Sequence, residues 1–388
     1  MESAPEERSL MPLIGRRKFL ADSGRAALLT SLLSMPALTQ GHQTFAKSKR
    51  NTAWDSFIDD LEQQIPKVMK ETVVPGLSIV IVKDAKLAWR RAFGVKDNTS
   101  KRPVDDGTVF EAASMTKPVF AYAVMKLCEK GVMNLDTPLT KYTPDRFLQG
   151  DSRLDLITAR HVLSHTSGFQ DWRSEKEPLK IHFTPGEKWL YSGEGYSYLQ
   201  SVVAHVTGES LEPYMRANVF VPFGMASSGF IWNEIFEKRM ARPHDAEGRA
   251  TDNNRATEES VARYGAAGEL RTTPTDYAKF LIEVIDPKPA DAFRLSKASL
   301  DKMLRPQVKV ESTKEYSISW ALGWRIARTS SDILISHGGY NRGFQCMVEG
   351  SVQQKAGYVI MTNGENGGEL LKKLAPAISL RLYPLSGH

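Results

Sequence analysis

This sequence of 388 residues contains only two cysteines, Cys128 and Cys346. Two cysteines cannot build a disulfide framework, and neither has the Cys-x-x-Cys or Cys/His spacing of a zinc site. Cys128 falls on an apolar helical stretch and Cys346 in a strand-like run, so we expect both to be small core residues. A single disulfide between them is the alternative.

Several catalytic and binding motifs are also missing. The chain has no Gly-x-Ser-x-Gly element, which excludes the α/β-hydrolase arrangement, and no phosphate loop or dinucleotide fingerprint. His161 and His165 are spaced like zinc ligands, but no glutamate lies between them and no third ligand is evident. We therefore expect no metal and no cofactor, and we interpret His165 as a structural hydrogen-bonding residue.

Charge of one sign is not concentrated anywhere in the chain. Lysine and arginine outnumber aspartate and glutamate by 51 to 45, and the formal net charge is +6. Because no long basic run is interleaved with aromatic residues, a nucleic-acid partner is not expected. The 41% hydrophobic and 25% charged residues are typical of a globular chain with one large domain or two lobes.

Long hydrophobic runs are missing as well. The apolar stretch 26–38 is too short and too rich in serine and threonine to span a bilayer. It follows the pair Arg16-Arg17, and this order resembles a twin-arginine export signal. We expect residues 1–41 to be this signal, residues 42–52 to be a flexible lead-in, and the mature protein to be periplasmic or secreted without a stable membrane anchor. A membrane-anchored or disordered tail is the alternative.

Strand-like apolar runs occur at both ends of the remaining chain. Trp54–Val68 has helical apolar spacing, and two strand-like runs then form a hairpin, Leu77–Val82 and Leu87–Val95. The C-terminal part predicts four strands and a closing helix, at Ala321–Ile326, Asp332–Ser336, Gly343–Glu349, Tyr358–Thr362 and Leu370–Leu382.

The middle of the chain, about 130–260, has helical pieces such as Thr158–Leu163 and Tyr196–Val206. We therefore predict an α/β (α+β) fold for residues 53–388. In this fold both chain ends form one antiparallel sheet flanked by helices, with a mostly helical lobe inserted at about 130–260.

Ser114 and Lys117 are the strongest candidates for chemistry. If they open a helix, residues i and i+3 share a face, and the amine can reach the hydroxyl. Serine needs an adjacent base to act as a nucleophile, and lysine is a base only when burial or a nearby cation lowers its pKa. The surrounding helix is apolar on most sides, an unusual place for a lysine without a task. A solvated lysine is the alternative.

Two later segments supply further candidates. Tyr191 lies in a glycine-rich stretch before a helix, where a phenol beside a lysine could relay a proton; a ring packed in a loop is the alternative. Gly338 and Gly339 follow a predicted strand, Asp332–Ile335. Paired glycines let backbone N–H groups approach a ligand closely, as an oxyanion hole requires, and a tight hairpin is compatible with this.

These motifs together resemble the serine β-lactamase and penicillin-binding protein superfamily. The resemblance is to the class C β-lactamase-like branch, which also contains class VIII carboxylesterases, DD-peptidases and D-amino-acid peptidases. It runs from about Phe57 to Leu382. Its landmarks are Ser114-x-x-Lys117, Tyr191-x-Gly193, His337-Gly338-Gly339, Leu163–Phe169, Pro185-Gly186, Pro222–Met225, Gly268–Thr273, Leu322–Trp324 and Thr362–Gly364.

The resemblance implies a role for each candidate. Ser114 would be acylated, and Lys117 and Tyr191 would share its proton and later return it. The remaining positions would hold the substrate: the backbone N–H groups of Ser114 and Tyr340 as oxyanion hole, and His337, Gly338, Gly339 and Gly193 as substrate-binding residues.

Two departures from the family pattern refine the expected function. Gly193 replaces an asparagine that in β-lactamases helps to hold the substrate's amide, and His337 replaces a lysine. A neutral imidazole binds an anion less well than an ammonium group. We therefore predict a serine hydrolase that acts through an acyl-enzyme on small esters or amides. A β-lactamase, DD-peptidase or D-aminopeptidase acting on a lactam or peptide is one alternative, and a non-catalytic member that binds peptidoglycan or a partner is another.

Overall fold

The structure is a computed structural model that describes residues 52–313, 316–328 and 332–383. The predicted export signal 1–41 and nearly all of the predicted lead-in lie outside the described residues. Within the described ranges, every helix is too short or too polar to cross a membrane.

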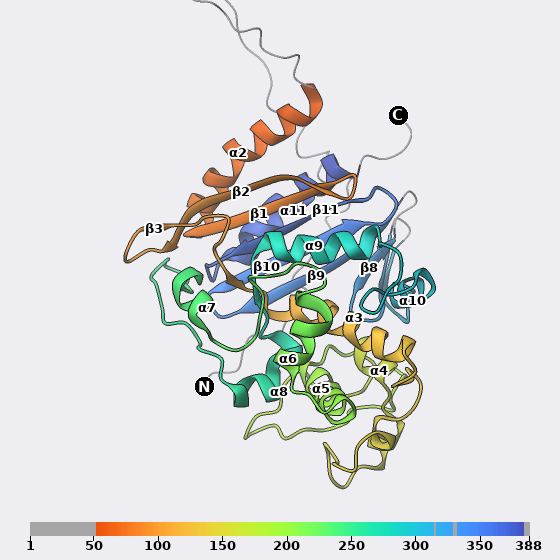
Figure 1. The fold of residues 1–388 in the computed structure, drawn as a ribbon. Coiled ribbons are helices and arrows are strands. Elements are labelled where there is room, and N and C mark those ends of the chain that lie inside the picture. The colour runs from red at the N-terminus through yellow and green to blue at the C-terminus, as the bar shows by residue number, and fades with distance from the viewer. Residues whose placement is uncertain (1–51, 314–315, 329–331, 384–388) are drawn as a thin grey trace, which may run out of the picture.

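Nine strands of the described chain form one sheet in the order β3-β2-β1-β11-β10-β9-β8-β7-β6 (Figure 1). Every neighbouring pair is antiparallel, so the predicted sheet class is confirmed. The strands are β1 Gly76–Lys83, β2 Lys86–Asp97, β3 Arg102–Pro103, β6 Val308–Ser312, β7 Ser317–Trp320, β8 Arg325–Arg328, β9 Ile333–Asn341, β10 Phe344–Ser351 and β11 Ala356–Thr362.

The two ends of the chain meet in the middle of this sheet. β1 pairs with β11 in the register Ile79↔Ile360, which joins the first strand to the last. Side chains alternate between the faces of β1, and nearly all of them are buried, as expected for a strand covered on both sides. α2 Thr52–Thr72 and α11 Gly367–Leu382 cover one face, and α9 Pro274–Ile285 crosses the other (Figure 1).

The helical lobe lies between two short strands, β4 Phe110–Glu111 and β5 Arg271–Thr272, which pair with each other. This pairing brings the start and the end of the lobe together beside β9. The other helices are η1 Ala113–Met115, α3 Thr116–Glu129, η2 Leu139–Lys141, η3 Ser152–Leu156, α4 Ala159–Leu163, α5 Gly193–Thr207, α6 Leu211–Met215, η4 Arg216–Phe220, α7 Glu234–Arg239, α8 Glu258–Gly268 and α10 Lys297–Met303.

Two strand predictions were wrong in their limits. The apolar run 321–324 is the turn between β7 and β8, closed by a bond from Ala321 N–H to Trp324 O over 2.8 Å. The run is hydrophobic because it is a buried turn packed against α3. A Cβ at Gly323 would lie only 2.6 Å from the Ala121 side chain of that helix. Conversely, the strand predicted to end near Ser336 continues through the paired glycines to the end of β9.

Both cysteines lie in described parts of the chain, and both are free thiols. Cys346 is buried on β10, and its Sγ donates to the backbone oxygen of Glu111 over 3.1 Å. Cys128 is partly buried near the end of α3. The expectation of small core residues holds for Cys346, and the alternative of a disulfide between the two is wrong.

Candidate active site

Ser114 lies in a single 3₁₀ turn, η1, immediately before α3. The preceding residue, Ala113, has a φ of +48°, a conformation that residues with a side chain rarely adopt. Thr116 fastens the turn, because its Oγ1 donates to Ala113 O over 2.6 Å. Such strained positions persist only where the surroundings hold them, and here they leave the Ser114 side chain partly exposed.

Lys117 lies one turn further on and is 1% exposed. Its Nζ donates to Ser114 Oγ over 3.0 Å and to the backbone oxygen of Ala267 over 2.6 Å. The structure thus brings together the two residues of the Ser-x-x-Lys motif. Ala267 could not be identified from the sequence, because a backbone acceptor carries no side-chain signal.

Aromatic rings surround the Lys117 amine. Its Nζ lies 4.7 Å from the ring centroid of Tyr191 and 5.5 Å from that of Tyr196. Tyr191 in turn stacks on His165 at 4.2 Å and meets Trp320 edge-on at 5.9 Å. The Tyr191 ring therefore lies beside the amine in an orientation fixed by packing.

His165 holds the segment that carries Tyr191. It is fully buried, and its Nδ1 accepts the Ser192 N–H over 3.1 Å while its backbone oxygen accepts from Leu190 over 2.8 Å. Burial, followed by the Lys117 charge, lowers the pKa of His165 well below its ordinary value. His161 has a different task, since its Nδ1 accepts the Thr158 N–H at the start of α4. Among the described residues, no group of three or more possible metal ligands is found.

His337, on β9, faces the same amine. Its Nδ1 lies 2.6 Å from Gly338 O, so this nitrogen carries the proton, and its ring centroid is 6.4 Å from that of Tyr191. Burial and then the Lys117 ammonium lower the pKa of His337 to about 3. The imidazole is therefore neutral near pH 7 and supplies no permanent positive charge.

This shift predicts a pH-dependent loss of stability that His337→Asn removes. Between about pH 3 and 6.5 the unfolded chain binds the His337 proton more tightly than the folded one, so the free energy of unfolding decreases as the pH is lowered through this window. We expect wild type to lose up to ~1.4 kcal/mol per pH unit more than His337→Asn. Urea unfolding at pH 7, 5.5 and 4 measures this. Parallel losses in both proteins would contradict a neutral, buried imidazole.

Gly339 lets β9 approach the nucleophile turn. A Cβ at Gly339 would lie 2.3 Å from Ala112 O, so any side chain there would push the strand away. The next residue, Tyr340, directs its side chain elsewhere, because its hydroxyl donates to Glu365 Oε1 over 2.6 Å. Burial and this contact raise the pKa of Tyr340 to about 12. The close approach places the Tyr340 backbone near η1.

At Gly193, the first residue of α5, the structure leaves no space for a side chain. A Cβ there would lie 2.4 Å from a ring carbon of Trp172. The Gly193 N–H donates to Asp171 Oδ1 over 2.7 Å. Trp172 could not be identified from the sequence, because nothing in the chain order links it to Gly193.

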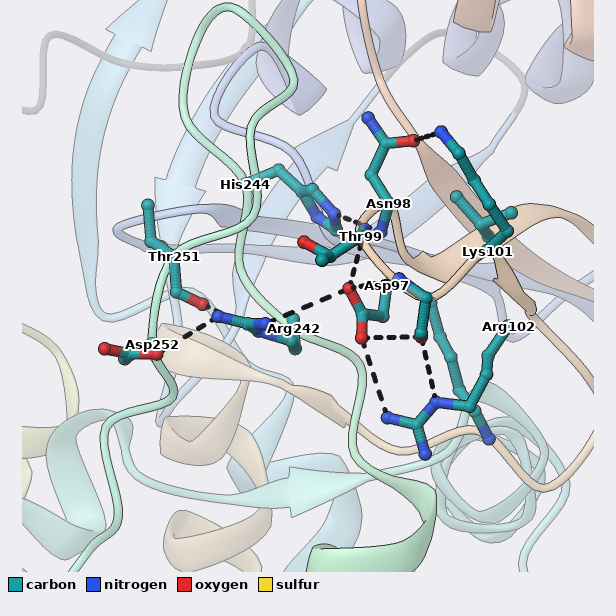
Figure 2. Close-up of polar contacts among 12 residues, drawn as sticks. Asp97, Asn98, Thr99, Lys101, Arg102, Arg242, His244, Thr251 and Asp252 are labelled. Atoms are coloured by element: carbon teal, nitrogen blue, oxygen red, sulfur yellow. Dashed lines mark hydrogen bonds and ion pairs between the residues drawn. The ribbon is translucent and has the colours of Figure 1, made fainter.

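A cavity of about 570 Å³ reaches Gly268, which lies against the Ala113 backbone of the nucleophile turn, but none of the candidate catalytic residues lines it. Its lining includes Gly268, which follows the Ala267 acceptor of Lys117. Figure 2 shows how one wall is fastened: Arg242 donates to Thr251 O over 3.2 Å and to Asp252 Oδ1 over 3.0 Å, and it lies 4.0 Å from Asp97. These contacts hold two lining residues in place.

The buried His244 anchors the same segment. Its Nε2 accepts the Asn98 N–H over 3.1 Å (Figure 2), and its Nδ1 lies 2.8 Å from Asn363 O. Burial lowers the pKa of His244, which keeps the ring neutral and both contacts intact. The cavity wall is therefore tied to the sheet.

This fold with this site defines a class, the serine hydrolases of β-lactamase/transpeptidase-like fold. Residues 58–383 match the family model described as beta-lactamase, and the chain belongs to that family.

Individual relatives differ in their named activities. The chain is 25% identical to penicillin-binding protein 4* of Bacillus subtilis (strain 168), over 79% of this chain and 72% of that protein. It is 30% identical to esterase EstB of Burkholderia gladioli over 48% of this chain and 55% of the esterase, so that alignment spans about half of each protein.

Solved structures agree on the architecture. The octameric penicillin-binding protein homologue from Pyrococcus abyssi superposes with a TM-score of 0.70 at 25% identity, covering 84% of this chain and 77% of that one. D-alanine carboxypeptidase AmpC from Burkholderia cenocepacia gives a TM-score of 0.69 at 19% identity, over 85% and 99% of the two chains. At that identity, the second match shows the shared fold alone.

Proposed function

We propose that the protein hydrolyses esters or small amides through an acyl-enzyme on Ser114. The observation that carries this proposal is the 3.0 Å contact between Lys117 Nζ and Ser114 Oγ. The lysine is buried among aromatic rings while the serine is partly exposed. A base shielded from water beside a nucleophile open to substrate is the arrangement that acyl transfer needs.

Acylation uses the deprotonated form of Lys117: after the resting ammonium has lost a proton, its amine takes the Ser114 hydroxyl proton, and Oγ attacks the substrate's carbonyl carbon. The bond to the leaving alcohol or amine then breaks, and the proton passes to that group through Lys117 and Tyr191. In deacylation, water gives up a proton to the same groups, attacks the ester carbon and releases the acid and free Ser114. The backbone N–H groups of Ser114 and Tyr340 stabilise the oxyanion in both steps.

Two features favour an ester or simple amide over a β-lactam. His337 is neutral, so it offers a substrate carboxylate no permanent positive charge to pair with. Gly193 carries no amide, and Trp172 occupies the space where one would lie. The similarity to esterase EstB supports the same choice.

Peptide or lactam hydrolysis is the second candidate, favoured by the longer match to penicillin-binding protein 4*. On the sequence of residues 1–41 alone, we further propose that the protein acts outside the cytoplasm.

Covalent labelling tests the proposed function directly. We expect a fluorophosphonate to label the full chain once, and peptide mapping to place the label on Ser114. Labelling by a fluorescent penicillin at a comparable rate would favour the second candidate. An unlabelled protein, or a label on another residue, would overturn the acyl-enzyme and favour a binding protein of this fold.

A further inference from the structure

We propose that Trp172, together with Tyr264, forms an aromatic wall that binds a planar ring of the substrate. This inference rests on the proposed function and names the substrate class: esters that carry an aromatic ring close to the scissile bond. The ring can belong to the acyl group or to the alcohol, and the experiment below separates these two cases.

Trp172 is held in place on both sides. Asp171 accepts the Gly193 N–H over 2.7 Å, and Arg173 forms an ion pair with Glu194 over 2.6 Å. Both flanking residues are thus tied to the first turn of α5. The Trp172 side chain between them lies against Gly193 yet remains 40% exposed, so it offers a fixed ring face at low entropic cost.

Tyr264 of α8 completes the wall. Its ring meets the Trp172 ring edge-on at a centroid distance of 5.4 Å, and the two planes are 76° apart. The Arg263 guanidinium lies 4.9 Å from the centroid of the Tyr264 ring. Edge-on pairs of this kind add stability beyond the area that they bury, so the wall is preorganised.

The wall opens into the cavity beside the nucleophile. Trp172, Tyr264 and Gly268 all line it, and a Cβ at Gly268 would lie 3.7 Å from the backbone of Ala113. Ala113 precedes Ser114. The cavity therefore begins beside the residue that precedes the nucleophile, within reach of a substrate bound to Ser114, and its volume of about 570 Å³ suits a small ligand.

Several polar groups of the cavity lining already bind one another. Buried Glu111 and Arg271 pair at 3.4 Å, and Asn341 Nδ2 donates to Glu111 Oε2 over 2.6 Å. Burial raises the pKa of Glu111 despite the neighbouring arginine. Arg342 also lines the cavity but is exposed, where water weakens its attraction for a substrate charge. The aromatic faces are therefore the recognition surface.

Three esters followed in a pH-stat test the proposal: ethyl acetate, benzyl acetate and methyl phenylacetate. We expect wild type to show a kcat/KM about tenfold higher for at least one ring-bearing ester than for ethyl acetate. Benzyl acetate identifies a ring on the alcohol side, and methyl phenylacetate a ring on the acyl side. Trp172→Ala should lower this preference to near unity, whereas Trp172→Phe should keep most of it.

Phe293→Ala is the matched control, because Phe293 is 37% exposed and lies outside the cavity lining. Thermal unfolding of each variant verifies that it folds, and Tyr264→Ala, which removes the other ring of the wall, replaces Trp172→Ala in the test if that variant does not fold. A preference for the ring-bearing ester that Trp172→Ala, or Tyr264→Ala in its place, leaves unchanged overturns the aromatic wall, as does a wild type without such a preference, while Ser114 labelling still supports the hydrolase. Absence of Ser114 labelling in wild type rejects the proposed function itself.

Discussion

Replacing Ser114 by alanine is expected to lower kcat/KM for a short-chain p-nitrophenyl ester by about 10⁴-fold or more. The variant loses the only atom that forms the covalent bond to substrate in the proposed mechanism, and water alone must attack. The free energy of unfolding should change by less than ~1 kcal/mol, because Ser114 Oγ is partly exposed and its partner Lys117 keeps the bond to Ala267 O. Initial rates and urea unfolding measure both quantities.

Ser201→Ala is the control for this substitution. Ser201 lies exposed on α5, and its hydroxyl donates to Tyr198 O over 2.7 Å on the same helix. Its removal should leave ester hydrolysis within about twofold of wild type. Ester turnover that survives Ser114→Ala in a purified protein would reject the acyl-enzyme at this residue.

Replacing Lys117 by methionine is expected to lower kcat/KM by about 10²–10⁴-fold, the contribution typical of a general base. Methionine retains the length and apolar character of the side chain, so the aromatic surroundings stay filled. A burst of product should be lost as well, because acylation becomes slow. Combining Lys117→Met with Ser114→Ala should cost no more than Ser114→Ala alone, since residues that act as a unit are not additive.

Lys126 supplies a matched control on the same helix. It is 7% exposed, and its Nζ donates to Asp291 O over 2.8 Å and Arg294 O over 2.7 Å. Lys126→Met removes a buried amine of the same kind away from Ser114, so it should reduce stability but leave kcat/KM within about threefold. If both variants reduce kcat/KM to the same extent, Lys117 serves the fold rather than proton transfer.

The fold could be predicted where one local signal decides the structure. A continuous apolar run made β1 visible, the turn after it predicted the hairpin with β2, and helical spacing made α2 and α11 visible. The signal failed at 321–324, because a buried turn is as apolar as a strand. Local hydrophobicity reports burial, and without a period it does not distinguish a buried strand from a buried turn.

The candidate site could be predicted only in part for a related reason. Ser114 and Lys117 are three residues apart, so a single helical turn brings them together and the sequence reveals the pair. Trp172 and Gly193 meet only because a loop folds back over the start of α5. No spacing rule predicts such a contact, and the aromatic wall was therefore invisible before the structure.

By itself, the sequence determined the family, the Ser-x-x-Lys pair and the strands at both chain ends, because each depends on short-range spacing or on ordered motifs. The tertiary structure decided the chemical state of the site. It buries Lys117, keeps His337 neutral and places Trp172 where an amide side chain would otherwise lie. These properties arise from desolvation and steric contact between distant segments, which exist only once the chain has packed.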